Sequence, residues 1–191
     1  MFEFRLTAFT DALAPAFEAQ GYEWMASGQQ FRKQHAHGFN AVVFSPSVYD
    51  DEVILEVSLG SRHRLVEELV SSIGKQGLSN GQHGFSAITT LGKQLELKHK
   101  RLRAGNPEQT RELGDALLEF FENGGFELME KLAGREGLHQ ALNHEPSKPS
   151  LFANNQLLRC FRGLAIAHVI DASNLHSLAK VYEARLQKLG A

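Results

Sequence analysis

Hydrophobic residues recur every three or four positions near the start of the chain, which predicts an amphipathic helix over about residues 7–20. The residues that carry this period are Leu6, Phe9, Leu13 and Phe17. Gly21 provides the left-handed stop that such a helix needs. Pro15 lies inside the segment and lacks a backbone donor, so we expect either a bend or a helix that begins nearer Thr10.

The hydrophobic period then changes to two, which predicts strands at residues 30–35, 39–45 and 52–59. His37-Gly38 suits a tight turn between the first two strands, whereas residues 45–51 read as a longer connection. Connections this short make antiparallel hairpins, because a parallel crossover needs a dozen or more residues.

A second helix is expected to follow directly, with Ser61 as its N-cap and Gly74 as its end. Residues 74–84 contain four glycines and are predicted to form a loop. Residues 85–97 can supply a fourth strand, and a basic stretch follows at residues 98–103.

The pattern becomes helical after residue 105. Asn106 suits an N-cap, with Pro107 at the first helical position and Gln109 at the third. Further helices are expected at 126–132, 138–142, 157–169 and 173–189, with an exposed linker at residues 143–150.

Strands followed by helices define the α+β class. We therefore predict a single domain over residues 1–191, in which an antiparallel sheet of about four strands packs against helices. Its mixed α/β part covers about residues 1–105, and its helical C-terminal half covers about residues 106–191.

A motif pattern over about residues 5–70 adds a resemblance. A helix that ends in Gly21-Tyr22, a strand that contains Phe31-Arg32 and a later strand at residues 53–60 make up this pattern. It resembles a group of small bacterial α+β domains of unknown function. The resemblance implies the same fold and implies no activity, because the group has none assigned.

Composition narrows the class of protein. The chain has 191 residues, of which 42% are hydrophobic and 13 are Phe, so it is long and apolar enough to bury a core. Its single cysteine, Cys160, excludes an intrachain disulfide and any cysteine-rich metal site. The first residues lack a signal peptide's basic head, and no apolar run is long enough to span a bilayer. We therefore expect a cytoplasmic protein without membrane association.

The net charge of −2 hides blocks of opposite sign. Residues 1–60 carry 3 basic and 8 acidic side chains, and residues 61–105 carry 8 basic and 3 acidic ones. The next two blocks, 106–146 and 147–191, are again acidic and then basic. Blocks of opposite sign attract within one fold, so we expect self-complementarity. Nucleic-acid binding is not expected, because the pI is about 6.5 and no aromatic residue lies between Phe85 and Phe120.

Two short strings match catalytic motifs without their structural context. Residues 77–81 match the nucleophile elbow GxSxG around Ser79, but no parallel sheet is predicted to support an elbow. Ser177 and Lys180 match SxxK inside an amphipathic helix, where an exposed helix surface is the simpler interpretation. The sequence therefore predicts no catalytic residue and no cofactor.

The chain has nine histidines. His35 and His37 lie two positions apart, a spacing that can bind a metal on a strand, and His139 and His144 could approach each other at a helix end. These four are weak metal candidates, because no helical HExxH spacing or cysteine cluster accompanies them. A metal site is therefore not predicted.

The leading functional hypothesis is a non-catalytic cytoplasmic binding or interaction protein, of an accessory or immunity type, with one protein partner. The runner-up is a small hydrolase that uses histidine or metal chemistry. An enzyme should show a pocket where histidines or carboxylates converge, whereas a binding module should show a broad apolar or charged patch.

Overall fold

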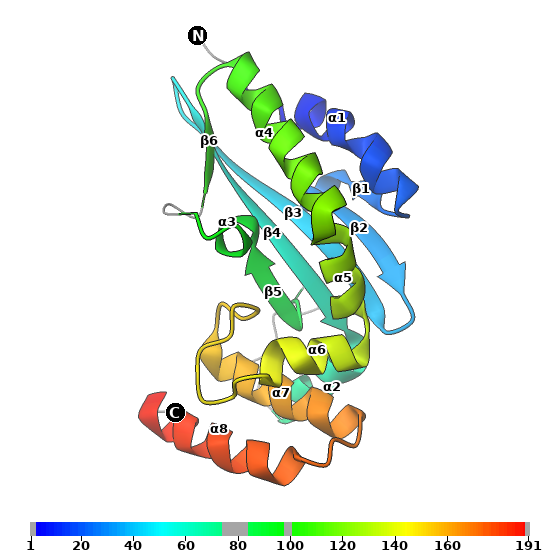
Figure 1. Cartoon of the computed structure of the whole chain (residues 1–191), viewed down its shortest axis with the longest axis vertical. Coiled ribbons are helices and arrows are strands. Elements are labelled where there is room, and N and C mark those ends of the chain that lie inside the picture. Colours follow the sequence, from blue (N-terminus) through cyan, green and yellow to red (C-terminus); the bar gives the residue numbers. More distant parts are fainter. Residues whose placement is uncertain (1–2, 74–83, 98–100, 190–191) are drawn as a thin grey trace. The chain divides into compact units, whose positions relative to one another are not determined.

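A computed structural model describes residues 3–73, 84–97 and 101–189 of the chain and has the predicted α+β architecture (Figure 1). Its strands are β1 (Glu23–Met25), β2 (Gln30–His35), β3 (Gly38–Val48), β4 (Val53–His63), β5 (Ala87–Thr90) and β6 (Leu102–Ala104). Its helices are α1 (Leu6–Ala19), α2 (Arg64–Ile73), α3 (Leu91–Gln94), α4 (Pro107–Phe120), α5 (Phe126–Ala133), α6 (Arg135–Asn143), α7 (Gln156–Val169) and α8 (Leu175–Leu189).

The strands form one antiparallel sheet in the order β1-β2-β3-β4-β5, and β6 pairs with β4 off this path. Trp24 of β1 lies opposite Phe31 of β2, and Val53 of β4 lies opposite Ala104 of β6. The antiparallel sheet and the helical C-terminal half are therefore confirmed. None of the helices in the described part of the chain is both long and apolar enough to cross a membrane.

The chain forms two compact units, each assembled from three separate segments. The first unit comprises Met1–Gln34, Ala41–Leu59 and Thr90–Met129, and the second comprises His35–Asn40, Gly60–Thr89 and Glu130–Ala191. Strands β2, β3 and β4 pass from one unit into the other. The expectation of a single domain stays a prediction.

The core of the first unit is aromatic. The Phe17 ring of α1 stacks on Phe31 of β2 with ring centres 4.4 Å apart, and Phe121 meets Phe17 edge-on at 4.8 Å. Helices α1 and α4 lie side by side in this unit (Figure 1). Helix α1 begins at Leu6 and continues through Pro15 to Ala19, so the alternative start near Thr10 is wrong.

The core of the second unit includes the predicted final helix pair. Cys160 and Ala167 of α7 pack with Leu178 and Tyr182 of α8, and all four side chains are buried. Burial raises the pKa of the Cys160 thiol, which makes it an inert core residue rather than a nucleophile.

The prediction of Ser61 as a helix N-cap is wrong. Strand β4 continues to His63, and α2 begins at Arg64. The Ser61 carbonyl accepts a hydrogen bond from the Ser86 N–H at 2.8 Å, and the Ser61 hydroxyl donates to the Leu132 carbonyl at 3.0 Å. Both groups of Ser61 are thus satisfied in an extended conformation, so the residue has no capping role.

Four other segments also differ from the prediction. Strand β3 extends to Val48, and the Tyr49 N–H bonds to the Glu52 carbonyl at 2.8 Å, so the predicted long connection is a tight turn. Residues 85–97 form only the short strand β5, because Thr90 then accepts a hydrogen bond from the Lys93 N–H and caps α3. Strands β1 and β6 were not predicted, since three residues are too few to show a period.

The N-cap predicted for α4 is confirmed, since the Asn106 side chain accepts a hydrogen bond from the Gln109 N–H at 2.9 Å. The predicted exposed linker at 143–150 carries mostly exposed side chains, but its backbone is bound by a buried arginine. Arg159 donates to the carbonyls of Leu142, Glu145 and Lys148 and is 1% exposed.

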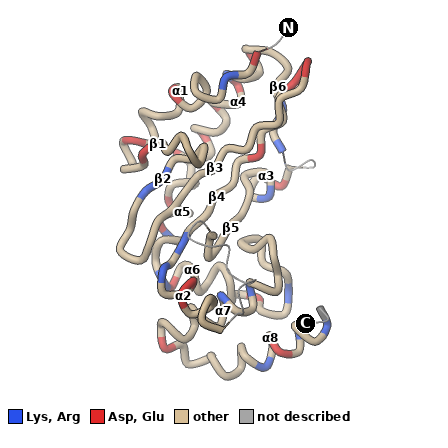
Figure 2. The backbone as a smooth tube through the Cα atoms, turned by 180° about the vertical axis from the view of Figure 1, so that it is seen from behind, with Lys and Arg blue, Asp and Glu red and all other residues tan. Residues whose placement is uncertain are grey.

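Opposite charges of different blocks meet at the edge of the first unit. Arg101 lies 3.2 Å from Glu56, and Arg103 of β6 lies 3.3 Å from Glu52 at the start of β4. Figure 2 shows acidic positions at the β3–β4 hairpin end beside β6. The basic stretch at 98–103 is thus used in part for internal pairing, as the charge blocks predict.

Candidate functional site

Three histidines of the second unit form a cluster. His35 ends β2, His37 lies in the turn before β3, and His63 ends β4. Their ring centres are 5.2 Å apart for His35 and His63, 5.7 Å for His37 and His63, and 6.2 Å for His35 and His37. The sequence predicted that His35 and His37 lie near each other, and it missed His63.

The approach of two backbones brings these side chains together. A Cβ atom at Gly38 would lie 2.0 Å from the Arg62 carbonyl oxygen, so only glycine permits β3 to approach β4 this closely. The His37 carbonyl accepts a hydrogen bond of 2.8 Å from the Arg64 N–H at the start of α2. The turn predicted at His37-Gly38 is confirmed, and it places the His37 ring against the His63 ring at an angle of 24°.

The hydrogen bond of His63 fixes which ring nitrogen carries its proton. His63 is 2% exposed, and its Nε2 lies 2.8 Å from the Leu132 carbonyl oxygen, which can only accept. In the neutral ring Nε2 therefore holds the hydrogen, and Nδ1 keeps a lone pair. Leu132 lies in the last turn of α5, where carbonyl groups lack a partner within the helix.

Burial disfavours a positive charge in the cluster. It lowers the pKa of His35 to about 4, and the neighbouring His63 and His37 rings act in the same direction. Burial also lowers the pKa of His63, while the hydrogen bond to the Leu132 carbonyl opposes this change. His35 is therefore neutral at pH 7, and its Nδ1 accepts a hydrogen bond from the His37 N–H at 3.2 Å.

A buried polar network, which we call the Glu67 network, is hydrogen-bonded to the cluster through the backbone N–H of His63. The His63 N–H donates to the Ser86 hydroxyl at 3.0 Å, and this hydroxyl donates to Glu67 at 2.8 Å. Arg162 of α7 then binds both carboxylate oxygens of Glu67 at 2.9 Å. Every charge in this network is paired, so the network fixes the end of β4 and leaves no reactive group free.

A hollow of about 290 Å³, which we call the histidine hollow, opens beside the cluster within the second unit. Its polar lining comes from His37, His63, Arg64, Glu68 and Arg135. Its apolar lining comes from Ala36, Leu65, Val66, Ile166 and Val169. It is a concave site with convergent polar groups, as ligand sites are.

The four weak metal candidates do not form one site. Within the described residues, no group of three or more His, Cys, Asp or Glu side chains could hold a metal ion. The Nδ1 atom of His139 lies 2.9 Å from the Asn143 amide, and that of His144 lies 3.0 Å from the Gln140 amide. Five positions of a helix correspond to a turn of about 140°, so these two rings face different directions.

The two catalytic strings do not add to a site. Ser177 and Lys180 are exposed on α8, and the Ser177 hydroxyl donates to the Asn174 carbonyl at 2.8 Å. Most of the predicted loop at 74–84, including Ser79, lies outside the described residues.

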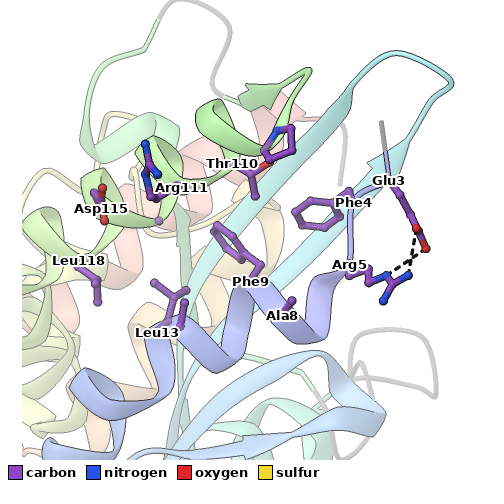
Figure 3. Close-up of a pocket in the computed structure, with 13 residues that line it drawn as sticks. Glu3, Phe4, Arg5, Ala8, Phe9, Leu13, Thr110, Arg111, Asp115 and Leu118 are labelled. Carbon is purple, nitrogen blue, oxygen red and sulfur yellow. Dashed lines mark hydrogen bonds and ion pairs between the residues drawn. The ribbon is translucent and has the colours of Figure 1, made fainter. Parts of the chain in front are cut away.

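The first unit contains a second concave site, the α1–α4 groove, with a volume of about 360 Å³ (Figure 3). Phe9 and Leu13 of α1 and Leu118 of α4 form its apolar floor together with Phe4. The Phe9 ring is held by Phe4 at 5.8 Å and by Phe44 of β3 at 6.1 Å.

Charged groups flank the α1–α4 groove on both sides. On the α1 side Arg5 donates to both carboxylate oxygens of Glu3 at 3.1 Å, and on the α4 side Arg111 and Asp115 lie one helical turn apart (Figure 3). Gly114 lies between these two residues in the sequence and has no side chain, so α4 projects no side chain into the groove at this position. The hydrophobic period predicted Phe9 and Leu13 as part of an apolar helix face, and it did not identify Phe4 or Leu118.

Comparison of the chain with protein-family models, with curated proteins and with solved structures gives no match. The resemblance of residues 5–70 to small bacterial α+β domains therefore stays a prediction. The fold is that of an α+β protein, and its function has to be argued from its concave sites, of which the histidine hollow and the α1–α4 groove are the two described above.

Proposed function

We propose that this chain is a non-catalytic binding protein and that the α1–α4 groove receives an amphipathic helix of one protein partner. The observation that carries the proposal is the apolar floor of this groove between two charged rims. Helix-in-groove recognition uses this arrangement, with apolar anchors in the groove and charged residues outside it.

The groove is large enough to receive apolar side chains of a partner helix. Its volume of about 360 Å³ lies at the lower end of the range of ligand sites, about 300–1,000 Å³. Phe9 is 6% exposed and Leu13 is 1% exposed, so the floor is fixed by the core rather than formed by mobile residues. A preformed floor lowers the entropy cost of binding.

The charges of the rims favour a protein over a nucleic acid. Each rim carries both signs, with Glu3 and Arg5 on one side and Arg111 and Asp115 on the other. A nucleic acid would need a rim of positive charge to neutralise phosphates. An amphipathic protein helix has charges of both signs beside its apolar face, which complements these rims.

The alternative, a hydrolase that uses histidine or metal chemistry, is favoured by one observation, the convergence of His35, His37 and His63. Such an enzyme needs a nucleophile beside one of these rings or a metal held by them. Within the described residues, no hydroxyl or thiol is hydrogen-bonded to a ring of the cluster, and no metal-binding group is found. The binding function therefore has the stronger support.

The experiment is a selection of amphipathic helical peptides displayed on phage against the immobilised chain. Gly114→Leu raises the α4 wall into the groove, and Ala8→Arg places a charge in it at an exposed position. Gly114→Ala is the matched control, because its Cβ would lie 3.6 Å from Phe9 and 4.0 Å from Leu13, at ordinary contact distances.

We expect the selected peptides to lose about tenfold or more in affinity for Gly114→Leu and Ala8→Arg and to keep their affinity for Gly114→Ala. Equal affinity for all variants, or a selection that yields no peptide, would overturn the proposal. A cytoplasmic location and an accessory or immunity-type role belong to the same proposal, and a buried free thiol at Cys160 supports a reducing compartment.

A further inference from the structure

The histidine hollow has positive charge that is not neutralised within the described residues. Arg64 is exposed at the first position of α2, and Arg135 is half-buried at the first position of α6. Neither guanidinium has an ion pair or a hydrogen bond to another described side chain, whereas the buried Arg162 is paired with Glu67. Glu68 is the one carboxylate among the residues that line the hollow.

The hollow also contains a buried ring with one nitrogen still available. Nε2 of His63 is bound to the Leu132 carbonyl, and Nδ1 has no hydrogen bond to any described residue. In the neutral ring this Nδ1 carries a lone pair, which can accept a hydrogen bond from a ligand. The first turn of α2, whose N–H groups favour negative charge, lines the same hollow through Arg64 and Val66.

The remaining lining is apolar. Leu65 and Val169 line the histidine hollow, and they also line an adjoining hollow of about 530 Å³ in the same unit. Leu65 is 50% exposed, although its neighbour Val66 is buried. A ligand that fills both hollows therefore needs an apolar part as well as a charged one.

We propose that the histidine hollow binds an organic oxyanion, a carboxylate or a phosphate ester, whose charged group meets Arg64 and Arg135 and whose apolar part covers Leu65 and Val169. A guanidinium forms strong charge-assisted hydrogen bonds to either group. The phosphate ester has a larger negative charge and more acceptor oxygens than the carboxylate, and its monoanion also has a hydroxyl that can donate to the Nδ1 lone pair of His63. This site lies in the second unit and is independent of the α1–α4 groove.

The test is a calorimetric titration of the whole chain at pH 7 and constant ionic strength with four probes. Phenyl phosphate and benzoate carry an apolar ring, whereas inorganic phosphate and acetate carry the charge alone. We expect the first two to bind more tightly than the last two, and the ranking of phenyl phosphate against benzoate decides between a phosphate and a carboxylate ligand.

Arg135→Gln should weaken the binding of phenyl phosphate or benzoate about tenfold, the worth of one hydrogen bond to a charged group. Arg111→Gln, on the rim of the α1–α4 groove, is the matched control and should leave this binding unchanged. If Arg135→Gln unfolds the chain, Arg64→Gln at the exposed position gives the same test. Equal binding to the wild type and to both hollow variants, or heats that sodium chloride reproduces, would overturn the proposal.

Discussion

Arg162 of α7 donates hydrogen bonds of 2.9 Å to both carboxylate oxygens of Glu67 on α2, 95 positions earlier in the chain. Their side chains are 9% and 3% exposed. The pair thus joins the helix that follows the histidine cluster to the C-terminal helices of the second unit. Its geometry is bidentate, which is the strongest arrangement that an arginine and a carboxylate can form.

Replacement of Glu67 by Ala should lower the free energy of unfolding by about 3–5 kcal/mol, because it leaves the buried Arg162 charge without a partner. Urea denaturation followed by circular dichroism measures this change. The matched control is Glu145→Ala, whose pair with Lys148 is exposed on both sides and should therefore contribute far less to the free energy of unfolding. Equal losses for the two variants would contradict the assignment of Glu67 as a buried anchor.

Gly38→Ala should destabilise the chain by about 1–3 kcal/mol, the cost of overpacking against atoms that cannot move aside. The Cβ atom would collide with the Arg62 carbonyl, which belongs to the backbone of β4. The displacement should also separate the His37 and His63 rings, so the ring resonances of both should shift in NMR spectra. An unchanged midpoint of urea denaturation would show that the strands are farther apart than described.

Gly114→Ala makes the same chemical change with the opposite expected sign. Gly114 lies in the middle of α4, and an added Cβ meets only ordinary contacts with Phe9 and Leu13. Alanine should therefore raise the free energy of unfolding by about 0.5–1 kcal/mol through its higher helix propensity. Thermal melting measures the gain, and a loss of stability would mean that the groove floor is tighter than the described contacts.

Acid should destabilise the second unit through His35. Its pKa is about 4 in the folded chain, against an ordinary value of about 6.5 in the unfolded one. Between these values the unfolded ring takes up a proton that the folded ring does not, so the free energy of unfolding falls as the pH falls from about 6.5 toward 4. The surrounding groups are His63 and His37, which oppose protonation, and Glu130, which favours it.

Urea midpoints at pH 7.5 and pH 5 measure this dependence. His35→Asn should flatten it, because the amide oxygen can still accept the His37 N–H but takes up no proton. His176→Asn, at an exposed position of α8, is the matched control for the same chemical change away from the cluster. A slope that is the same in the protein with and without His35 would exclude this ring as its source.

Tyr182→Phe should cost about 1–3 kcal/mol, because it leaves a buried amide oxygen without a donor. The Tyr182 hydroxyl donates to Asn143 at 2.6 Å, and burial raises the pKa of Tyr182 to about 12, which keeps the hydroxyl protonated. Denaturation of Tyr182→Phe beside the exposed control Tyr49→Phe measures the difference. A control that loses as much as Tyr182→Phe would show that the buried bond contributes nothing.

Periodicity in the sequence predicted the α+β class, the first three long strands and the final helix pair, because each of these buries one regular face. It placed the end of the third strand at Leu59, since Ser61 also suits a helix cap. That choice hid His63, which belongs to the histidine cluster only when the strand continues. The deciding interaction is the hydrogen bond from the Ser61 hydroxyl to the Leu132 carbonyl. Leu132 lies 71 positions after Ser61, so no local sequence pattern contains this interaction.

The buried arginines were beyond prediction for a related reason. The sequence predicted a helix over residues 157–169 but assigned no role to Arg159 and Arg162, and both are buried in the structure. Arg159 is satisfied by backbone carbonyls at 142–148, and Arg162 by Glu67. Every residue has a backbone carbonyl, so the sequence does not reveal which carbonyls accept hydrogen bonds from a buried arginine. Only the three-dimensional structure identifies them.

The interleaved units have a consequence for synthesis on the ribosome. The second unit takes its last segment from residue 130 onward, so His63 and Glu67 are made long before Leu132 and Arg162. In a nascent chain that ends before residue 132, the Glu67 carboxylate has not yet met Arg162. The His63 ring at the end of β4 likewise lacks the Leu132 carbonyl as its hydrogen-bond acceptor. Such a chain cannot complete its second core, and it remains a substrate for chaperones and proteases until α7 has emerged.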